Sequence, residues 1–253
     1  MSESKFKFPT EEVELPSRGL LYPEGHPLKS GKIEMKYMTA REEDILTNQN
    51  YIAKGIVLDK LLQSLIITDV KLKDLFIGDK NAILIASRIL GYGKDYQIRY
   101  NGQAHTVDLS LLENKKIDEK LFTGGKNEFD WTLPHSGTKL TYRLLTDGLD
   151  KEIEAEIKGI QKINKGASPE ISTRMKYLIT SVEGDSSGKT VRDFVDTYLL
   201  ARDAKALRDH IIKIQPDIEL KTQITNEFDE LEEIDVPISL NFFFPDAEWS
   251  TKL

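Results

Sequence analysis

Residues 37–92 read YMTAREEDILTNQNYIAKGIVLDKLLQSLIITDVKLKDLFIGDKNAILIASRILGY and have the clearest helical periodicity in the sequence. Apolar residues recur in it at intervals of three and four, which is typical of helices that bury one face. The two clearest stripes are Leu58, Leu61, Leu62, Leu65 and Ile66, and Ala82, Ile85, Ala86, Ile89 and Leu90. With a shorter helix expected at Leu72, Leu75 and Phe76, the stretch predicts three or four short helices that pack on one another or on a sheet.

The starts of these helices carry signals of their own. Thr39 and Glu42 have the spacing of a capping box, and the acids at 42–44 would lie in the first helical turn, where the helix dipole favours negative charge. Consecutive residues point in different directions around a helix, so we interpret these acids as capping groups and not as a catalytic pair. A break is expected near residues 48–50, and Asp79 is expected to cap the last helix of the stretch.

Residues 1–36, which precede this stretch, are rich in proline and glycine, and both residues resist regular structure. Leu20, Leu21 and Tyr22 stand together in this arm, closer than a flexible tail would carry them. We expect an extended arm that lies either on its own domain, as an ordered loop, or on a partner. The three residues are therefore candidate partner contacts.

Two β-hairpins are expected after the central stretch. In the first, Tyr96, Ile98 and Tyr100 alternate with polar residues, and Asn101-Gly102 is a strong signal for a two-residue turn. The second covers residues 129–144 and has a loop with proline and glycine. Its alternating apolar residues are Phe129, Trp131 and Leu133 on one strand and Leu140, Tyr142 and Leu144 on the other.

Residues 146–214 return to helical spacing. Ser168-Pro169-Glu170 is a good helix start, with a cap and a proline at the first position. A break is expected near Arg202-Asp203, and Pro216 ends the run. The three expected stripes are Leu149, Ile153, Ile157 and Ile160; Ile171, Met175, Leu178, Ile179 and Val182; and Val191, Phe194, Val195, Tyr198 and Leu199, continued by Ala204, Leu207, Ile211 and Ile214.

A third hairpin is expected at the C-terminal end. Its first strand would hold Ile218 and Leu220, its tip would be the acidic run EFDELEEID at 227–235, and its return strand would follow from residue 236. Three consecutive phenylalanines cannot all face one side of a strand, so at least one should point to a second buried face or to a partner. These residues, Phe242, Phe243 and Phe244, are further candidate partner contacts.

The segment GDSSGKT at 184–190 resembles a phosphate-binding P-loop. The full pattern needs a glycine at position 183, where the chain has Glu183, and an acid there would repel phosphate. A P-loop also follows a strand, whereas the preceding residues have helical spacing. We therefore interpret the segment as a turn between two helices, with Gly188 in the turn, and not as a nucleotide site.

Composition sets limits on the function. The 253 residues carry no cysteine, which excludes disulfides and thiolate metal sites. The net charge of −7 argues against general binding to nucleic acid or to an anionic membrane, because both need a cationic surface. The N-terminal sequence lacks the apolar region of a signal peptide, so we expect the protein to stay in the compartment where it is made. No arrangement of residues suggests a catalytic site or a cofactor.

These patterns together predict the fold class α+β, with bundles of short helices combined with antiparallel β-hairpins. The expected division is an arm at 1–36, a helical domain with a hairpin at 37–112, a linker and second hairpin at 113–146, and a helical domain with the C-terminal hairpin at 147–253. Two halves of similar order, helices followed by a hairpin, emerge from this division, although the sequence shows no convincing residue-level repeat.

Four segments resemble one family. They are LPSRGLLYPEGHPLKSGKIEMKYMTAREEDILT at 15–47, KGIVLDKLLQSLI at 54–66, IGDKNAILIASRILGYG at 77–93 and VPISLNFFFPD at 236–246. Together they resemble the baseplate hub family of T-even-like contractile-tailed phages. The likeness is strong over residues 15–110, moderate over 217–245 and weak between. No single motif in it is chemically diagnostic, so its weight comes from the length of the similar text.

The chain also differs from this family in one respect. Relatives in that family can carry cysteine pairs with zinc-ribbon spacing at hairpin tips, and this chain has none. The corresponding tips are Asn101-Gly102 and residues 229–233. We therefore expect no zinc, with turn chemistry and packing in its place. The acidic tip is interpreted as a solvated loop and not as a cation site.

The resemblance implies a non-enzymatic structural or assembly protein of the tail baseplate hub, present in the host cytoplasm during assembly and then in the virion baseplate. Its expected partners are other phage tail and baseplate proteins, with self-association as a further expectation. No nucleic acid, membrane or small-molecule substrate is expected. Besides the arm and the phenylalanines, the charged face of the helix at 40–48 is a candidate contact surface. The alternative is a transient chaperone, for example for the tape-measure protein, that is absent from the finished particle.

Overall fold

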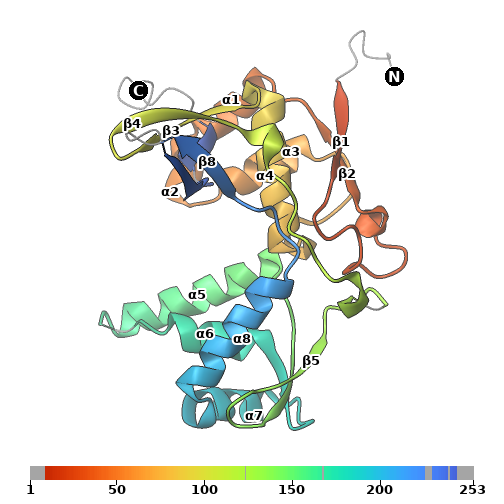
Figure 1. Ribbon diagram of the computed structural model, residues 1–253, viewed down its shortest axis with the longest axis vertical. Helices are drawn as coiled ribbons and strands as arrows, with labels where there is room; N and C mark the ends of the chain where they lie inside the picture. The colour runs from red at the N-terminus through yellow and green to blue at the C-terminus, as the bar shows by residue number, and fades with distance from the viewer. Residues whose placement is uncertain (1–8, 123, 167, 226–229, 239, 244–253) are drawn as a thin grey trace.

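The computed structural model describes residues 9–122, 124–166, 168–225, 230–238 and 240–243. Figure 1 shows two lobes, one above the other. Of the residues that the structure describes, those within 9–111 and 217–243 form the upper lobe, those within 129–214 form the lower lobe, and those within 112–128 form a linker along one side. Short helices and small antiparallel sheets occur in both lobes, which confirms the predicted α+β class.

The predicted helical stretch forms the centre of the upper lobe. Its stripes are buried as expected at Leu61, Leu62 and Leu65, while Leu58 is half-buried. The expected break at 48–50 is a cap, because the Asn48 side chain accepts hydrogen bonds from two amides that begin the next helix. The elements are α1 (Ala40–Leu46), α2 (Gln49–Ala53), α3 (Val57–Leu65), the 3-10 turn η2 (Leu72–Asp74) and α4 (Ile77–Tyr92).

The N-terminal arm is a hairpin and not a separate extension. Strands β1 (Thr10–Glu14) and β2 (Lys32–Lys36) pair antiparallel, with Val13 opposite Ile33. The long loop between them includes the 3-10 turn η1 (Pro27–Ser30) and buries Leu15, Leu21 and Leu28. Of the two alternatives, the structure has the ordered loop packed on its own lobe.

The first predicted hairpin is confirmed. Strands β3 (Asp95–Tyr100) and β4 (Gln103–Asp108) pair with Ile98 opposite His105. Asn101 and Gly102 both have positive φ, 49° and 83°, as a type I′ turn requires. The 3-10 turns η3 (Leu109–Leu111) and η4 (Glu119–Leu121) follow along the linker.

The lower lobe contains the second predicted hairpin and one strand that the sequence did not reveal. Strands β5 (Phe129–Thr132) and β6 (Lys139–Tyr142) pair as expected, with Trp131 opposite Leu140. Strand β7 (Ile179–Val182) adds to β6, so the expected helix through Val182 is wrong beyond Leu178. Its four residues bond to a strand about 40 positions earlier, and helical spacing over so short a run cannot exclude a strand.

The helices of the lower lobe are α5 (Asp147–Ile163), α6 (Glu170–Leu178), α7 (Gly188–Asp193) and α8 (Ala201–Ile214). A π-helical turn, η5 (Phe194–Tyr198), extends α7. The break expected near residues 202–203 exists but lies slightly earlier, at residues 199–200 between η5 and α8, and Asp203 lies buried inside the first turn of α8. Pro169, expected at the first helical position, is instead the N-cap of α6.

The C-terminal hairpin differs from the prediction in register and in place. Strands β8 (Lys221–Thr225) and β9 (Leu231–Asp235) form it, so much of the expected acidic tip is itself the return strand. Phe242 and Phe243 follow in a 3-10 turn, η6 (Leu240–Phe243), and not in a strand. Figure 1 shows β8 beside β3 and β4 in the upper lobe, away from the helices that precede it in the chain. The second helix-plus-hairpin unit is therefore divided between the lobes.

Most of the buried apolar side chains belong to one cluster that continues from the upper lobe into the lower one. Helix α5 is an exception, since Leu149, Ile153 and Ile157 form a small cluster of their own with Tyr177 of α6. The face that α5 turns to the upper lobe is consequently polar, and its charged groups meet charged groups of α3 and α4 there.

Candidate functional site at the junction between the lobes

The predicted contact residues of the arm lie largely inside the protein. Leu21 and Tyr22 are buried and Leu20 is half-buried. The Tyr22 ring stacks on His26 and meets the edge of Phe76. In this conformation these side chains hold the arm to its own lobe, and their role as partner contacts stays a prediction.

The predicted contacts at the C-terminal end are also internal. Phe242 and Phe243 are buried, and Phe242 meets the edge of the Tyr96 ring on β3. Phe244 lies outside the described residues. The two consecutive phenylalanines are both buried because a 3-10 turn inserts them between α4 and the β3–β4 hairpin, whereas a strand would have directed them to opposite faces.

A buried arginine, which the sequence analysis missed, anchors that turn. Arg88 on α4 donates to the carbonyl oxygens of Phe242 at 3.0 Å, Gly93 at 2.9 Å and Asp95 at 3.2 Å. Its guanidinium also lies over the Tyr92 ring, 5.2 Å from the centroid. Burial lowers the pKa of Arg88 from its ordinary value, but three carbonyls and an aromatic face stabilise the charge. The C-terminal turn is thereby fixed to the end of the predicted helical stretch.

Asp79 does not cap α4, which begins two residues earlier, and this corrects the prediction. Its fully buried carboxylate accepts from the Ser17 amide at 2.9 Å and from the Tyr22 hydroxyl at 2.8 Å. Burial raises the pKa of Asp79, and burial beside Asp79 raises the pKa of Tyr22. This carboxylate is thus the polar link between the N-terminal loop and α4.

A buried acid also occurs near the start of three other helices. Glu42, Asp147 and Asp203 are also buried, and each lies in the first turn of its helix. Asp203 accepts from the amides of His135 and Ser136 in the β5–β6 loop, and these bonds lower its pKa against the opposing effect of burial. An acid in a first turn was visible in the sequence, but nothing there distinguished a buried one from a solvated one.

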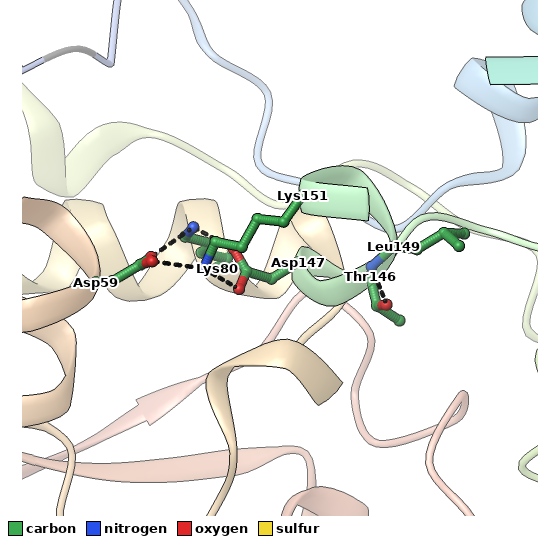
Figure 2. Close-up of polar contacts among 6 residues, drawn as sticks. All are labelled: Asp59, Lys80, Thr146, Asp147, Leu149 and Lys151. Carbon is green, nitrogen blue, oxygen red and sulfur yellow. Dashed lines mark hydrogen bonds and ion pairs between the residues drawn. The ribbon is translucent and has the colours of Figure 1, made fainter. Parts of the chain in front are cut away.

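At the junction, four charged side chains alternate in sign (Figure 2). Lys80 of α4 contacts Asp59 of α3 at 3.4 Å and also contacts Asp147 of α5. Lys151 of α5 contacts Asp59 at 2.5 Å and Asp147 at 2.7 Å. We call these four residues the junction tetrad. It joins two helices of the upper lobe to the first helix of the lower lobe, and its formal charges sum to zero.

Backbone hydrogen bonds also join the two lobes next to the tetrad. Phe76 and Thr146 form a single antiparallel bridge between the lobes. The Asp147 amide donates to the Leu75 carbonyl at 2.8 Å, and the Ile77 amide donates to the Leu145 carbonyl at 3.2 Å. Since α4 and α5 both start at this bridge, their first turns lie next to each other, and the tetrad forms where they meet.

A groove of about 580 Å³ borders the tetrad. It is lined by the loop at residues 66–73, by Gln63 and by two tetrad members, Asp147 and Lys151. Lys71 and Lys73 also line it, and within the described part of the chain neither has an ion pair. Burial would lower the pKa of Lys151, but its hydrogen bonds to the two aspartates raise it, so the lysine keeps its charge. The arrangement suits a stable ionic contact between lobes better than proton transfer.

The glycine-rich turn at 184–190 has a different environment from the one expected. A strand does precede it, contrary to the prediction, because β7 ends at Val182 and α7 begins at Gly188. Its polar groups, however, are used locally. The Asp185 carboxylate accepts from the Ser187 amide at 2.8 Å and from the Thr190 hydroxyl at 2.6 Å. That the turn does not bind nucleotide stays a prediction. Titration with ATP by calorimetry tests it, and saturable micromolar binding lost in Lys189→Ala would overturn it.

Among the residues that the structure describes, no group of three or more histidine, aspartate or glutamate side chains is placed to hold a metal ion. Within the same ranges, no helix has the length and apolar character needed to cross a membrane.

Comparisons of the chain with known protein families, with curated proteins and with solved structures found no match in any of the three.

Proposed function

We propose that this chain is a structural or assembly protein of the baseplate hub of a contractile-tailed phage, and that it works through protein–protein contacts without an enzymatic step. The family resemblance of residues 15–110 and 217–245 is the basis of this proposal. Its partners would be other tail and baseplate proteins, met in the host cytoplasm during assembly.

One structural observation supports the proposal. The two resembling segments are separated by about a hundred residues in the chain, yet they pack together in the upper lobe. Arg88 donates to the Phe242 carbonyl, and the Tyr100 hydroxyl on β3 donates to Glu232 on β9 at 2.5 Å. The weakly resembling segment between them forms the lower lobe. A family resemblance concentrated in one lobe is expected if that lobe carries the functional surface that the family shares.

Co-expression with the other hub components, followed by pull-down and sizing, tests the proposal. A defined complex that contains this chain is the expected result. On the upper lobe, Arg41→Glu on the exposed face of α1 should weaken the complex, and Lys162→Glu on the exposed end of α5 is the control with the same change in net charge. Failure of the chain to associate with any hub component would contradict the proposal.

The alternative is a transient chaperone for a tail component such as the tape-measure protein. It predicts the same complexes during assembly but not in the product. Mass spectrometry of purified virions separates the two, because abundant peptides from this chain in the particle are compatible only with a structural subunit.

A further inference from the structure

The outer edge of strand β8 is only partly covered by the rest of the chain. Before β8 begins, this edge is paired with the linker, where the Lys115 amide donates to the Asp217 carbonyl at 2.8 Å and the Glu219 amide donates to the Glu113 carbonyl at 2.7 Å. The backbone groups of odd-numbered residues therefore point to the linker side, because consecutive residues of a strand direct these groups to opposite edges.

The even-numbered residues point to the other edge, where β9 lies. The Val236 amide donates to the Leu220 carbonyl at 2.8 Å, which makes these two a hydrogen-bonded pair. By the two-residue repeat of an antiparallel ladder, Thr222 and Ile224 also bond to β9. The remaining residues direct their amide and carbonyl groups outward, and among the described residues these groups have no partner. They are Lys221, Gln223 and Thr225.

A groove of about 690 Å³ lies where the linker turns away from β8. Its walls include three lysines and three glutamates, so it is neutral, although the chain carries −7. Leu111 in its wall is 74% exposed, and Leu231, opposite the end of β8, is 72% exposed. A neutral surface with two exposed leucines permits two copies of an acidic protein to approach without repulsion.

We propose that two copies of this chain associate through this edge, with β8 of one copy antiparallel to β8 of the other across a two-fold axis at Gln223. The open part of the edge is centred on that residue, since the linker covers the edge up to Glu219 and β8 ends at Thr225. Lys221 then pairs with Thr225 of the second copy, and no like charges face each other. The product is a continuous four-stranded sheet, the isologous contact that two-fold dimers use.

This inference does not depend on the proposed function. The open edge is only five residues long, so the contact is small and belongs to the weak, concentration-dependent class. Sedimentation of the full chain over a range of concentrations is expected to show a shift from the monomer mass of 28.8 kDa toward the dimer. A mass that stays monomeric up to the solubility limit would overturn the proposal.

Gln223→Pro is the sharpest variant, because proline removes the central outward amide, which β9 does not use. We expect at least a tenfold increase in the dimer dissociation constant with an unchanged unfolding midpoint. The matched control is Glu12→Pro on β1. The bonds from Leu15 to Gly31 and from Tyr37 to Pro9 show that even-numbered residues of β1 also direct their amides outward, so this variant alters another open edge. If Gln223→Pro and Glu12→Pro have the same dimer dissociation constant, the two-fold model is wrong.

Cross-linking tests the register, because the chain has no cysteine of its own. In the proposed register, hydrogen-bonded partners have Cα atoms about 5.5 Å apart, within the range of a disulfide. Gln223→Cys is expected to cross-link with itself on oxidation. Lys221→Cys is expected to cross-link rapidly only when it is mixed with Thr225→Cys. Equal cross-linking by Glu12→Cys would show random collision and would count against the register.

Discussion

Phe76 and Thr146 pair as a single antiparallel bridge between the lobes, and each is the N-cap of the helix that follows it. The two helices therefore begin symmetrically on either side of one bridge. The segments around Phe76 and Thr146 share a short pattern, in which corresponding residues are 70 positions apart in the sequence (148 − 78). Its members are Leu75 and Leu145, Gly78 and Gly148, and Ile83 and Ile153. The likeness of the two halves is thus local to the junction, where the sequence alone showed no convincing repeat.

Gly78→Ala should destabilise the protein because α4 closely approaches the backbone of Pro216 and Asp217, just after α8, at this residue. A methyl group at Gly78 would overlap the carbonyl oxygen of Pro216. We expect a loss of about 2 kcal/mol in the free energy of unfolding, as for an overpacked core site. The control is Gly159→Ala in α5, which has open space around it and should gain about 0.5–1 kcal/mol from helix propensity. Urea unfolding measures both, and an equal effect would contradict the close approach.

Glu42→Gln should cost stability at neutral pH. Burial acts to raise the pKa of Glu42, but hydrogen bonds from Ser64, Thr39 and Lys36 lower it from 4.5 to about 2. A carboxyl whose pKa is depressed on folding stabilises the protein above its unfolded pKa, and the stabilisation is lost as the pH falls. The linkage corresponds to about 3 kcal/mol at pH 7.

The measurement is urea unfolding of wild type and Glu42→Gln at a series of pH values from 7 down to 2. The difference between them should be largest above pH 5 and should shrink as the pH falls from about 4.5 to about 2. Asp44→Asn, an exposed acid in the same helix, is the control and should change stability by less than about 0.5 kcal/mol. A difference that does not depend on pH would show that the Glu42 charge is not stabilising.

The two lysines of the junction tetrad should differ in their importance. Lys80 is 17% exposed and contacts the buried Asp147, whereas Lys151 is 48% exposed. Lys80→Met should therefore cost about 3 kcal/mol, because it leaves a buried carboxylate with one partner fewer. Lys151→Met should cost about 1 kcal/mol or less, and that cost should fall further in high salt. Equal losses in urea unfolding would show that the tetrad is uniformly solvated.

His210 should make the lower lobe sensitive to mild acid. Its ring stacks on Trp131, with centroids 4.7 Å apart, and its Nε2 lies 2.8 Å from the Tyr142 hydroxyl. Burial, together with the nearby Lys213, lowers the pKa of His210 below its ordinary value of 6.5. The unfolded chain then takes up the proton first, so stability should fall as the pH drops below about 6.5.

Unfolding monitored between pH 7 and pH 5 checks this expectation. His210→Gln should flatten the pH dependence in that window, and His135→Gln, on an exposed loop, serves as the control for the loss of any histidine. A wild-type profile that matches that of His210→Gln would contradict the assignment.

The parts of the fold that were predicted correctly are those determined by residues close together in the sequence. The stripe at Leu61, Leu62 and Leu65 and the turn at Asn101-Gly102 were correct, because helix periodicity and a positive-φ turn are encoded within a few residues. Strand β7 was missed, because only its pairing with β6 makes it a strand. The C-terminal hairpin was shifted, because its register follows from the burial of Ile224 and Ile234 against the upper lobe.

The junction site was less accessible to sequence reasoning. Lys80 and Asp147 are 67 positions apart and Asp79 and Ser17 are 62 apart, and no spacing rule connects such residues. The one signal available was the recurrence of an acid in the first turn of a helix. That signal is ambiguous, because a solvated acid also stabilises a helix start through the dipole.

Local patterns in the sequence were enough to predict the α+β class, the helices of the central stretch, the first two hairpins and the acids at the helix starts. All of these arise from interactions between near neighbours in the chain. Tertiary contacts, which no local pattern encodes, bury Glu42, Asp79, Asp147 and Asp203 and attach the C-terminal hairpin to the upper lobe. The reason is that burying a charge or a strand face requires partners, and here the partners come from distant segments that only folding brings together.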